Sequence, residues 1–177
     1  MPHNIALGPA AGTNHALEIL RGQNRPLSDW SPETGIAPAL HLVLDPDAVF
    51  DGHWSSPRGR LLDLEGEMRH PARWFALHVP LDALDLSDRA ILGFAARLSA
   101  PQTLPIRACL RSGRPGGFSD CFFDKPVLPS SDAGLHLDVL DMARHDISDD
   151  APWRDLVLFL PTRAFRLSLH DLRLFVV

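Results

Sequence analysis

Three residue types that cooperate in catalysis lie close together near the C-terminus of the 177-residue chain: Ser168, His170 and Asp171. They are the residue types of the serine-hydrolase triad. On a β-strand, however, Ser168 and His170 share one face while Asp171 points to the other. A flat strand also lacks the turn or helix N-terminus that supplies an oxyanion hole. Because the chain contains no G-x-S-x-G, H-E-x-x-H, P-loop or C-x-x-C spacing either, we expect no enzyme.

Potential metal ligands are present, but their spacing does not enforce a site. Zinc needs three or four converging ligands, and His136, Asp138 and His145 come nearest to such a set; outward-facing histidines on strands are the favoured interpretation. Calcium prefers oxygen-rich loops, and aspartates cluster at two places: Asp45, Asp47 and Asp51, and Asp146, Asp149 and Asp150. For both clusters we favour aspartates that cap turns.

The four tryptophans are the best candidates for contact with a ligand. Trp30 and Trp54 lie in loop-like sequence, "LSDWSPETG" and "DGHWSSPRG", where polar neighbours favour exposure. The alternative is that each plugs an end of the fold. Trp74 and Trp153 open strand-like segments, so we expect them to be at least partly in the core.

The charge balance excludes some partners. With 17 basic and 22 acidic residues the net charge is −5, which argues against nucleic acid. Arg107, Arg111 and Arg114 form one local basic group, for which a solvated edge is the simplest account. The N-terminus lacks the pattern of a signal peptide, and no apolar stretch is long enough for membrane insertion. The default expectation is a cytoplasmic protein, unless it is exported within a larger assembly.

The elements that must position these residues are strands. From residue 38 onward apolar residues recur at every second position, as half-buried strands require. The segments are 40–44, 75–81, 90–98, 104–111, 156–160 and 165–169. Connectors such as "LDPD" and "SGRPGG" are rich in turn residues. Short strands joined by short turns predict a β-sandwich or barrel. Residues 132–146 fit a strand or a helix, and we favour the strand.

Two local features specify the pairing of these strands. In "FRLSLHDLRLFVV" the apolar positions change from odd to even numbers at His170–Asp171, which predicts a β-bulge in a central strand paired on both sides. In "CLRSGRPGGFSDC" a hairpin with its turn at 113–117 would place Cys109 opposite Cys121, as neighbouring reduced thiols.

The first 36 residues differ from the rest in their glycine and proline content. We interpret them as an N-terminal arm with one short helix, capped by Asn14 and ended by Gly22. Residues 37–177 are expected to form a single β-sandwich domain.

The order of elements within 38–177 resembles that of galactose-binding-like jelly-roll domains, the group that contains many carbohydrate-binding modules. The resemblance rests on a strand at 74–81, the connector Asp85-Leu86-Ser87, paired strands at 90–98 and 106–111, a W-x-x-L strand at 153–160 and "DLRL" at 171–174. It departs from the family where His170 replaces a common acidic residue, and in having no tyrosine.

The resemblance implies an all-β, antiparallel jelly-roll sandwich that binds an oligosaccharide or polysaccharide without catalysis. Trp54 or Trp30 would be the stacking platform, and Arg107 and Arg111 would donate hydrogen bonds, a pattern suited to acidic sugars. It implies no cofactor beyond a structural calcium held by Asp171. The alternatives are a structural or interaction subunit with a protein partner, as in a surface or phage-like particle, and a hydrolase with an unrecognised site.

Overall fold

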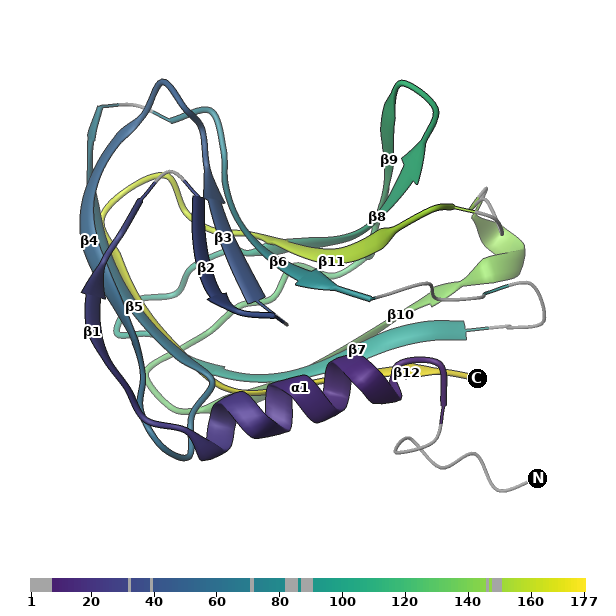
Figure 1. The fold of residues 1–177 in the computed structure, drawn as a ribbon, viewed down its shortest axis with the longest axis horizontal. Helices are drawn as coiled ribbons and strands as arrows, with labels where there is room; N and C mark the ends of the chain where they lie inside the picture. Colours follow the sequence, from purple (N-terminus) through teal and green to yellow (C-terminus); the bar gives the residue numbers. More distant parts are fainter. Residues whose placement is uncertain are drawn as a thin grey trace.

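Two antiparallel sheets of six strands form the molecule, here a computed structural model (Figure 1). It describes residues 8–31, 33–38, 40–70, 72–81, 86, 91–145, 147 and 151–177. The first sheet has the order β1 (Arg25–Asp29), β4 (Val49–Ser56), β5 (Leu62–His70), β12 (Phe165–Val176), β7 (Ile91–Ser99), β10 (Gly134–Asp141). The second has the order β2 (Glu33–Ala37), β3 (Leu40–Leu44), β6 (Phe75–Pro80), β11 (Arg154–Phe159), β8 (Arg107–Arg114), β9 (Gly117–Phe122). The predicted jelly-roll β-sandwich is confirmed.

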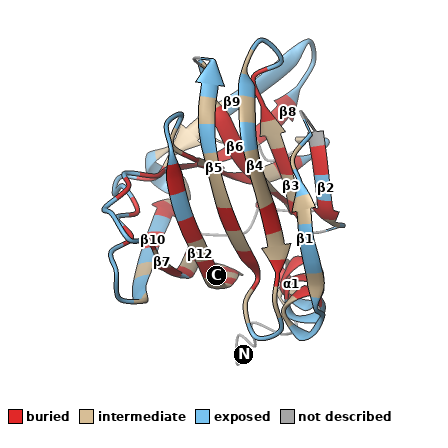
Figure 2. Cartoon of the chain, turned by 90° about the vertical axis from the view of Figure 1, so that its left-hand side faces the viewer, coloured by how far each residue is buried: buried red, intermediate tan, exposed pale blue. Residues whose placement is uncertain are grey.

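The core lies between the sheets and is filled by the alternate side chains that the period of two identifies. Leu42, Leu77, Phe94, Leu158 and Leu172 are all at most 2% exposed. Figure 2 shows the resulting alternation of buried and exposed positions along β4, β5 and β12. The segment 134–141 is a strand, as favoured from the sequence.

A helix, α1 (Ala11–Gly22), closes one side of the sandwich by bonding to both sheets (Figure 1). The Thr13 hydroxyl donates to the carbonyl of Pro80 in β6 at 2.9 Å. The Asn14 amide donates to the carbonyl of Leu174 in β12 at 2.7 Å and accepts from its N–H at 2.9 Å. The prediction that Asn14 caps the helix is wrong, because the helix begins three residues earlier and Asn14 acts as a substitute strand partner for β12.

Residues 25–36, which were expected to belong to the arm, contribute outer strands to both sheets. β1 pairs with β4 and β2 pairs with β3, both antiparallel. A 3₁₀ turn, η1 (Met142–Arg144), follows β10. Within the described ranges no helix is long and apolar enough to span a bilayer. Asp85 and Ser87 of the predicted connector, and Ala90 at the start of the predicted strand 90–98, lie outside the described residues.

The C-terminal strand contains the predicted bulge. β12 pairs with β5 on one side and β7 on the other, and its register against β7 shifts between Leu169 and Asp171. The Asp171 carboxylate accepts from Arg21 of α1 at 3.1 Å and lies 3.4 Å from Arg173. Asp171 therefore marks the bulge and also ties the helix to the strand.

The β8–β9 hairpin differs from its predicted register by one residue. Arg114 pairs with Gly117, so that the turn is only Pro115-Gly116, with Gly116 at a φ of 79°. Proline followed by a glycine with positive φ suits a tight turn. Cys109 consequently faces Phe122, while Cys121 faces Leu110. The prediction of neighbouring cysteines is wrong, since a slip of one residue turns each side chain to the opposite face.

Asp45 is a buried anion that fastens the start of β6. Its carboxylate is 1% exposed and accepts from the Arg73 backbone N–H and Nε, both at 2.9 Å. These hydrogen bonds hold the pKa of Asp45 well below its usual range. A carboxylate with a lowered folded pKa contributes stability above its unfolded pKa of about 3.9 and loses that contribution as the pH falls towards the folded value.

We therefore expect Asp45→Asn to lower the thermal midpoint at pH 7, and the difference from the wild type to shrink as the pH falls below about 4. Asp47→Asn is the control, because the Asp47 side chain is 85% exposed and lies 3.3 Å from the same arginine. Thermal melts across pH 2–8 would test this. A difference that stays constant with pH would show that the Asp45 charge does not stabilise the fold.

Candidate functional site

The outer face of the second sheet gathers aromatic and charged side chains from three neighbouring strands. Buried Ala108 and Leu110 point into the core, so the odd-numbered residues of β8 point outward. The strand register places six side chains on this face: Arg107, Arg111, Phe118, Asp120, Phe122 and Phe159. Arg107 and Arg111 are thus on the outward side, as their alternation with the apolar residues Ile106, Ala108 and Leu110 requires.

Both arginines lie over phenylalanine rings. The Arg107 guanidinium is 4.0 Å from the ring centroid of Phe122, and that of Arg111 is 3.9 Å from Phe118. Nε and Nη2 of Arg111 each donate to a different oxygen of Asp120 at 2.7 Å, and this contact raises the pKa of Arg111. Arg111 is therefore already paired with a carboxylate and held in a fixed orientation.

A small apolar cluster beneath the rings stiffens this face. Ala76, Cys109 and Val157 are buried on the outer side of the sheet, under Phe122 and Phe159. The two rings stack at a centroid distance of 5.9 Å. Burial raises the pKa of the Cys109 thiol to about 12, so Cys109 is a packing residue.

Trp153 lies flat on the same face, just before β11. Three atoms of its indole would be 2.4 to 2.7 Å from a Cβ built on Gly113, so the ring occupies the space that a side chain there would fill. Gly113 is opposite Phe118 and shares its outward side. Trp153 is 41% exposed. We call Trp153, Phe118, Phe122, Phe159, Arg107 and Arg111 the aromatic face.

A polar pair borders the aromatic face. His78 Nδ1 lies 2.8 Å from Asp155 Oδ2, and Asp155 is opposite Arg111 in the ladder. His41 of β3 is opposite His78. Hydrogen-bonding groups therefore continue from the aromatic rings across the sheet towards β3.

Neither predicted tryptophan platform has the exposure that stacking requires. Trp54 is 7% exposed, because β4 places it on the inward side between the sheets. Trp30 is half-buried, and its ring packs against Phe50, Phe75 and Phe165 at centroid distances of 4.5 to 6.5 Å. The two indoles support one end of the core, which was the alternative considered from the sequence.

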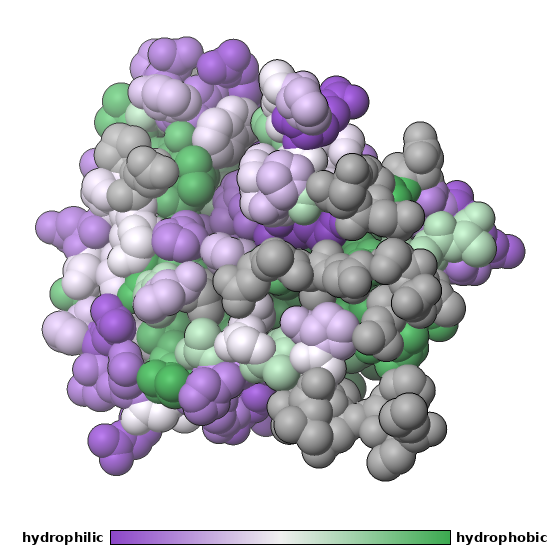
Figure 3. Space-filling model, turned by 45° about the vertical axis from the view of Figure 1, so that its right-hand side comes forward, coloured by the Kyte–Doolittle hydropathy of each residue, from purple (hydrophilic) through white to green (hydrophobic). Residues whose placement is uncertain are grey.

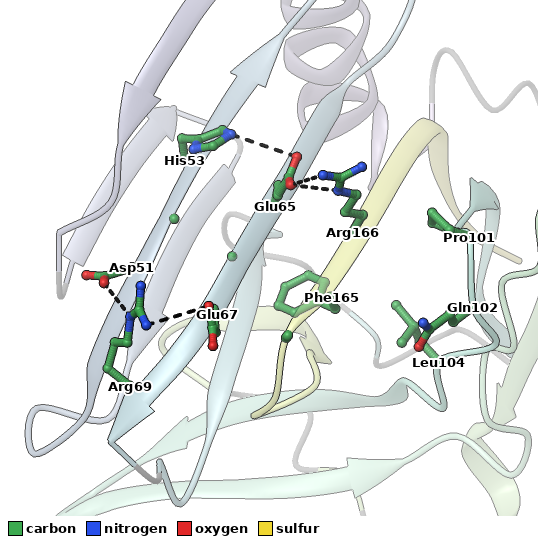
Figure 4. A pocket seen from close by; sticks show the side chains of 13 residues that line it. Asp51, His53, Glu65, Glu67, Arg69, Pro101, Gln102, Leu104, Phe165 and Arg166 are labelled. Atoms are coloured by element: carbon green, nitrogen blue, oxygen red, sulfur yellow. Dashed lines mark hydrogen bonds and ion pairs between the residues drawn. The ribbon is translucent and has the colours of Figure 1, made fainter.

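The first sheet carries a hollow of about 620 Å³ on its outer side, lined by both charged and apolar residues (Figure 4). It extends from β4 and β5 across the start of β12 to the loop at 101–104. Arg69 Nε donates to Asp51 at 2.7 Å, and Arg166 Nε donates to Glu65 at 2.6 Å. Figure 4 shows these ion-paired side chains standing over the strands along one side of the hollow, opposite Gln102.

The expected calcium site at Asp171 has no supporting geometry. Its carboxylate is bonded to Arg21 and lies beside Arg173. The two guanidinium groups thus already neutralise the carboxylate that would have to bind the metal ion. Among the described residues, no three His, Cys, Asp or Glu side chains come together as metal ligands. The His136 ring instead packs against Phe94 at a tilt of 36°, and the Asp138 carboxylate accepts from the backbone N–H of Lys125. The predicted cluster Asp146, Asp149 and Asp150 lies outside the described residues.

No known family model matches this sequence, and no curated protein matches it. Solved structures do. The N-terminal cellulose-binding domain of β-1,4-glucanase C from Cellulomonas fimi matches with a TM-score of 0.54 and 12% identity, covering 78% of this chain and 89% of that domain. The CBM22-1 xylan-binding domain of Paenibacillus barcinonensis Xyn10C matches with a TM-score of 0.53 and 8% identity, covering 88% and 96%.

A family 11 carbohydrate-binding module from Clostridium thermocellum, in complex with a β-1,3-1,4-mixed-linked tetrasaccharide, is also similar, with a TM-score of 0.50 and 11% identity over 84% of this chain and 95% of the module. At such identities the likeness concerns the fold alone. The chain has the jelly-roll fold of carbohydrate-binding modules, which confirms the resemblance inferred from its sequence.

Proposed function

We propose that the protein is a non-catalytic carbohydrate-binding domain, and that the aromatic face holds an oligosaccharide or polysaccharide chain. The observation that carries the proposal is the Trp153 indole, which lies flat over Gly113 and is 41% exposed. An aromatic ring buries the apolar C–H face of a sugar while the surrounding polar groups bond to its hydroxyls. The fold of the solved carbohydrate-binding modules supports the same function.

The ligand that this face suits is neutral. Arg111 already has a carboxylate partner in Asp120 and faces Asp155 across the ladder, so an acidic sugar would have to displace an intramolecular pair. The net charge of −5 also repels anionic polymers. Uncharged hydroxyls can instead accept from the guanidinium groups and donate to the carboxylates. This replaces the acidic sugars expected from the sequence.

The named ligands of the similar structures suggest the first probes: cellulose, xylan and β-1,3-1,4-glucan. In native gels cast with each soluble polymer, we expect at least one neutral β-glucan or xylan to retard the protein, and polygalacturonate to have no effect. Failure of every neutral polymer to retard the protein at high polysaccharide concentration would refute the proposal. Retardation by polygalacturonate alone would refute the preference for neutral chains.

Gly113 offers a test that leaves the tryptophan in place. A methyl group at position 113 would lie 2.4 Å from the indole nitrogen, so Gly113→Ala must push the ring off the sheet. We expect glycan affinity to fall several-fold and the fluorescence of Trp153 to change. Gly117→Ala in the same hairpin is the control, because nothing lies within 4 Å of a Cβ there. Equal affinities of the two variants would contradict the platform.

A second candidate function, an interaction subunit, is favoured by the outer strand β10. Leu135, Leu137 and Val139 point outward from it and are 74%, 52% and 38% exposed. On the side of the molecule turned forward in Figure 3, hydrophobic residues form patches among hydrophilic ones. β10 is the last strand of its sheet. Exposed apolar strands at a sheet edge pair readily with another chain.

The partner that fits best is a second copy. An antiparallel pair of β10 strands centred on Leu137 would set Leu135 of each copy opposite Val139 of the other, which is a two-fold symmetric arrangement. Sedimentation over a range of concentrations should show a dimer that Leu137→Asp dissociates. Leu128→Asp, at a loop residue that is 56% exposed, should leave the dimer intact. A wild-type protein that is monomeric at every concentration would exclude this candidate.

A further inference from the structure

The hollow on the first sheet lies apart from the aromatic face, which belongs to the second sheet. It forms where β5 extends past the beginning of β12, since Phe165, the first residue of β12, is opposite Gly66 and the register gives residues 67–70 of β5 no partner in β12. The loop at 101–104 lines the other side. The result is an open trough across the strand ends.

A smaller hollow of about 270 Å³ continues the trough towards β1. The two share His53, Glu65 and Arg166, and we call them together the groove. Figure 2 shows the face that carries the groove, formed by β1, β4, β5 and β12. This face belongs to the opposite sheet from the aromatic face, so the two sites open in different directions.

The groove is lined by paired charges. Glu65 lies between Arg166 and His53, at 2.6 Å from Arg166 Nε and 3.9 Å from His53 Nε2. Arg69 lies between Asp51, at 2.7 Å, and Glu67, at 3.8 Å. Each pair is about half exposed, so its outer lone pairs and N–H groups remain within reach of a ligand.

One further carboxylate lies at the smaller hollow. Asp63 lines the smaller hollow, and its Oδ2 bonds to Arg60 at 2.9 Å. Its Oδ1 is buried and has no hydrogen-bond partner in the part of the chain that the structure describes. That oxygen is closed to solvent, so a ligand would meet Asp63 through the rest of its side chain, which is 28% exposed.

We propose that the groove is a second carbohydrate site, which takes an uncharged polysaccharide chain through its hydroxyl groups. Its lining carries four carboxylates and two guanidinium groups, so an anion is repelled, whereas a sugar diol can donate to a carboxylate and accept from the adjacent guanidinium. Its aromatic member, Phe165, is 6% exposed, so binding rests on hydrogen bonds, in contrast to the stacking at Trp153.

Two sites on different sheets make the protein bivalent. A long polymer can be held by one molecule at two places, or two polymer chains can be joined, whereas a tetrasaccharide fills each site independently. The inference rests on the proposed function for the nature of the ligand. The two sites are nevertheless separable, because they share no residue.

Calorimetric titration with a β-1,3-1,4-mixed-linked tetrasaccharide, together with light scattering in the presence of the corresponding long polymer, tests the inference. The groove variant is Arg69→Ala/Arg166→Ala, and the face variant is Trp153→Ala. Arg58→Ala is the control, since Arg58 is exposed and lies outside the groove lining. We expect two tetrasaccharides per wild-type or control molecule and one per molecule of either site variant. Cross-linking of the polymer should require both sites.

The outcomes separate the two proposals. One tetrasaccharide per molecule, lost in the face variant and retained in the groove variant, would overturn the groove site and leave the aromatic face standing. One tetrasaccharide lost only in the groove variant would support the groove and overturn the aromatic face. No binding by the correctly folded wild type would overturn both.

Discussion

Trp153→Ala is expected to reduce affinity at the aromatic face at least tenfold, a loss of about 1.4 kcal/mol or more of binding free energy, with little change in stability. The indole is 41% exposed and rests on a glycine, so its removal opens no cavity in the core. Trp153 is the one tryptophan of the aromatic face, and the guanidinium groups of Arg107 and Arg111 already cover Phe122 and Phe118. Titration calorimetry with a tetrasaccharide measures the change.

Two further variants complete this test. Trp153→Phe keeps a smaller ring on Gly113 and should recover part of the affinity. Trp30→Phe alters a tryptophan that packs against Phe50 and Phe75 at the other end of the core, and it should bind as the wild type does. Loss of binding in Trp30→Phe, with Trp153→Ala unaffected, would return the platform to the residue first expected from the sequence.

The second large effect concerns stability. Asn14→Ala is expected to lower the free energy of unfolding by roughly 2–4 kcal/mol, because it leaves a buried N–H and a buried C=O of Leu174 without partners. The intrinsic preference of alanine for helices returns only about 0.5 kcal/mol. Urea unfolding followed by circular dichroism measures the difference.

The neighbouring exposed residue provides the control for Asn14. His15→Ala lies on the outer side of the same helix and should change stability by less than about 0.5 kcal/mol. If both variants unfold at the same urea concentration, α1 does not hold β12 through Asn14, and the closure of the sandwich by the helix would need another explanation.

The alternation of apolar residues predicted the core strands β3, β6, β7, β8, β11 and β12 and the bulge, although it did not identify β4 and β5. Those features depend on which face of a strand meets the other sheet, and the period of two records that directly. The phase change at His170–Asp171 predicted the register shift that β12 shows against β7. The outward direction of Arg107 and Arg111 followed from the same rule.

Other features depend on contacts between distant segments. Asn14 has the residue type of a helix cap, and only the position of Leu174, 160 residues away, gives it a different role. The hairpin register depends on the number of residues in its turn. Because the turn has only two residues, Pro115 and Gly116, the register shifts by one residue and Cys109 and Cys121 are not opposite each other. Short-range patterns do not contain this information.

The tryptophans were misplaced because local composition was weighed above strand phase. Polar neighbours suggested a loop for Trp54, which β4 turns into the core. For Trp153 the strand phase in the sequence did indicate an outward position. Leu156 and Leu158 are even-numbered core residues of β11, so an odd-numbered residue just before them points outward, and Gly113 provides the flat surface beneath it.

The most direct test of the central claim, that the aromatic face binds carbohydrate, is to map backbone amide shifts by NMR while adding the glycan that retards the protein most. We predict that the largest saturable shifts fall on β8, β9 and the residues around the start of β11, at Arg111, Phe118 and Trp153, in addition to any shifts in the groove. Saturable shifts that spare these three strands would contradict it, and so would a spectrum that does not change at millimolar glycan.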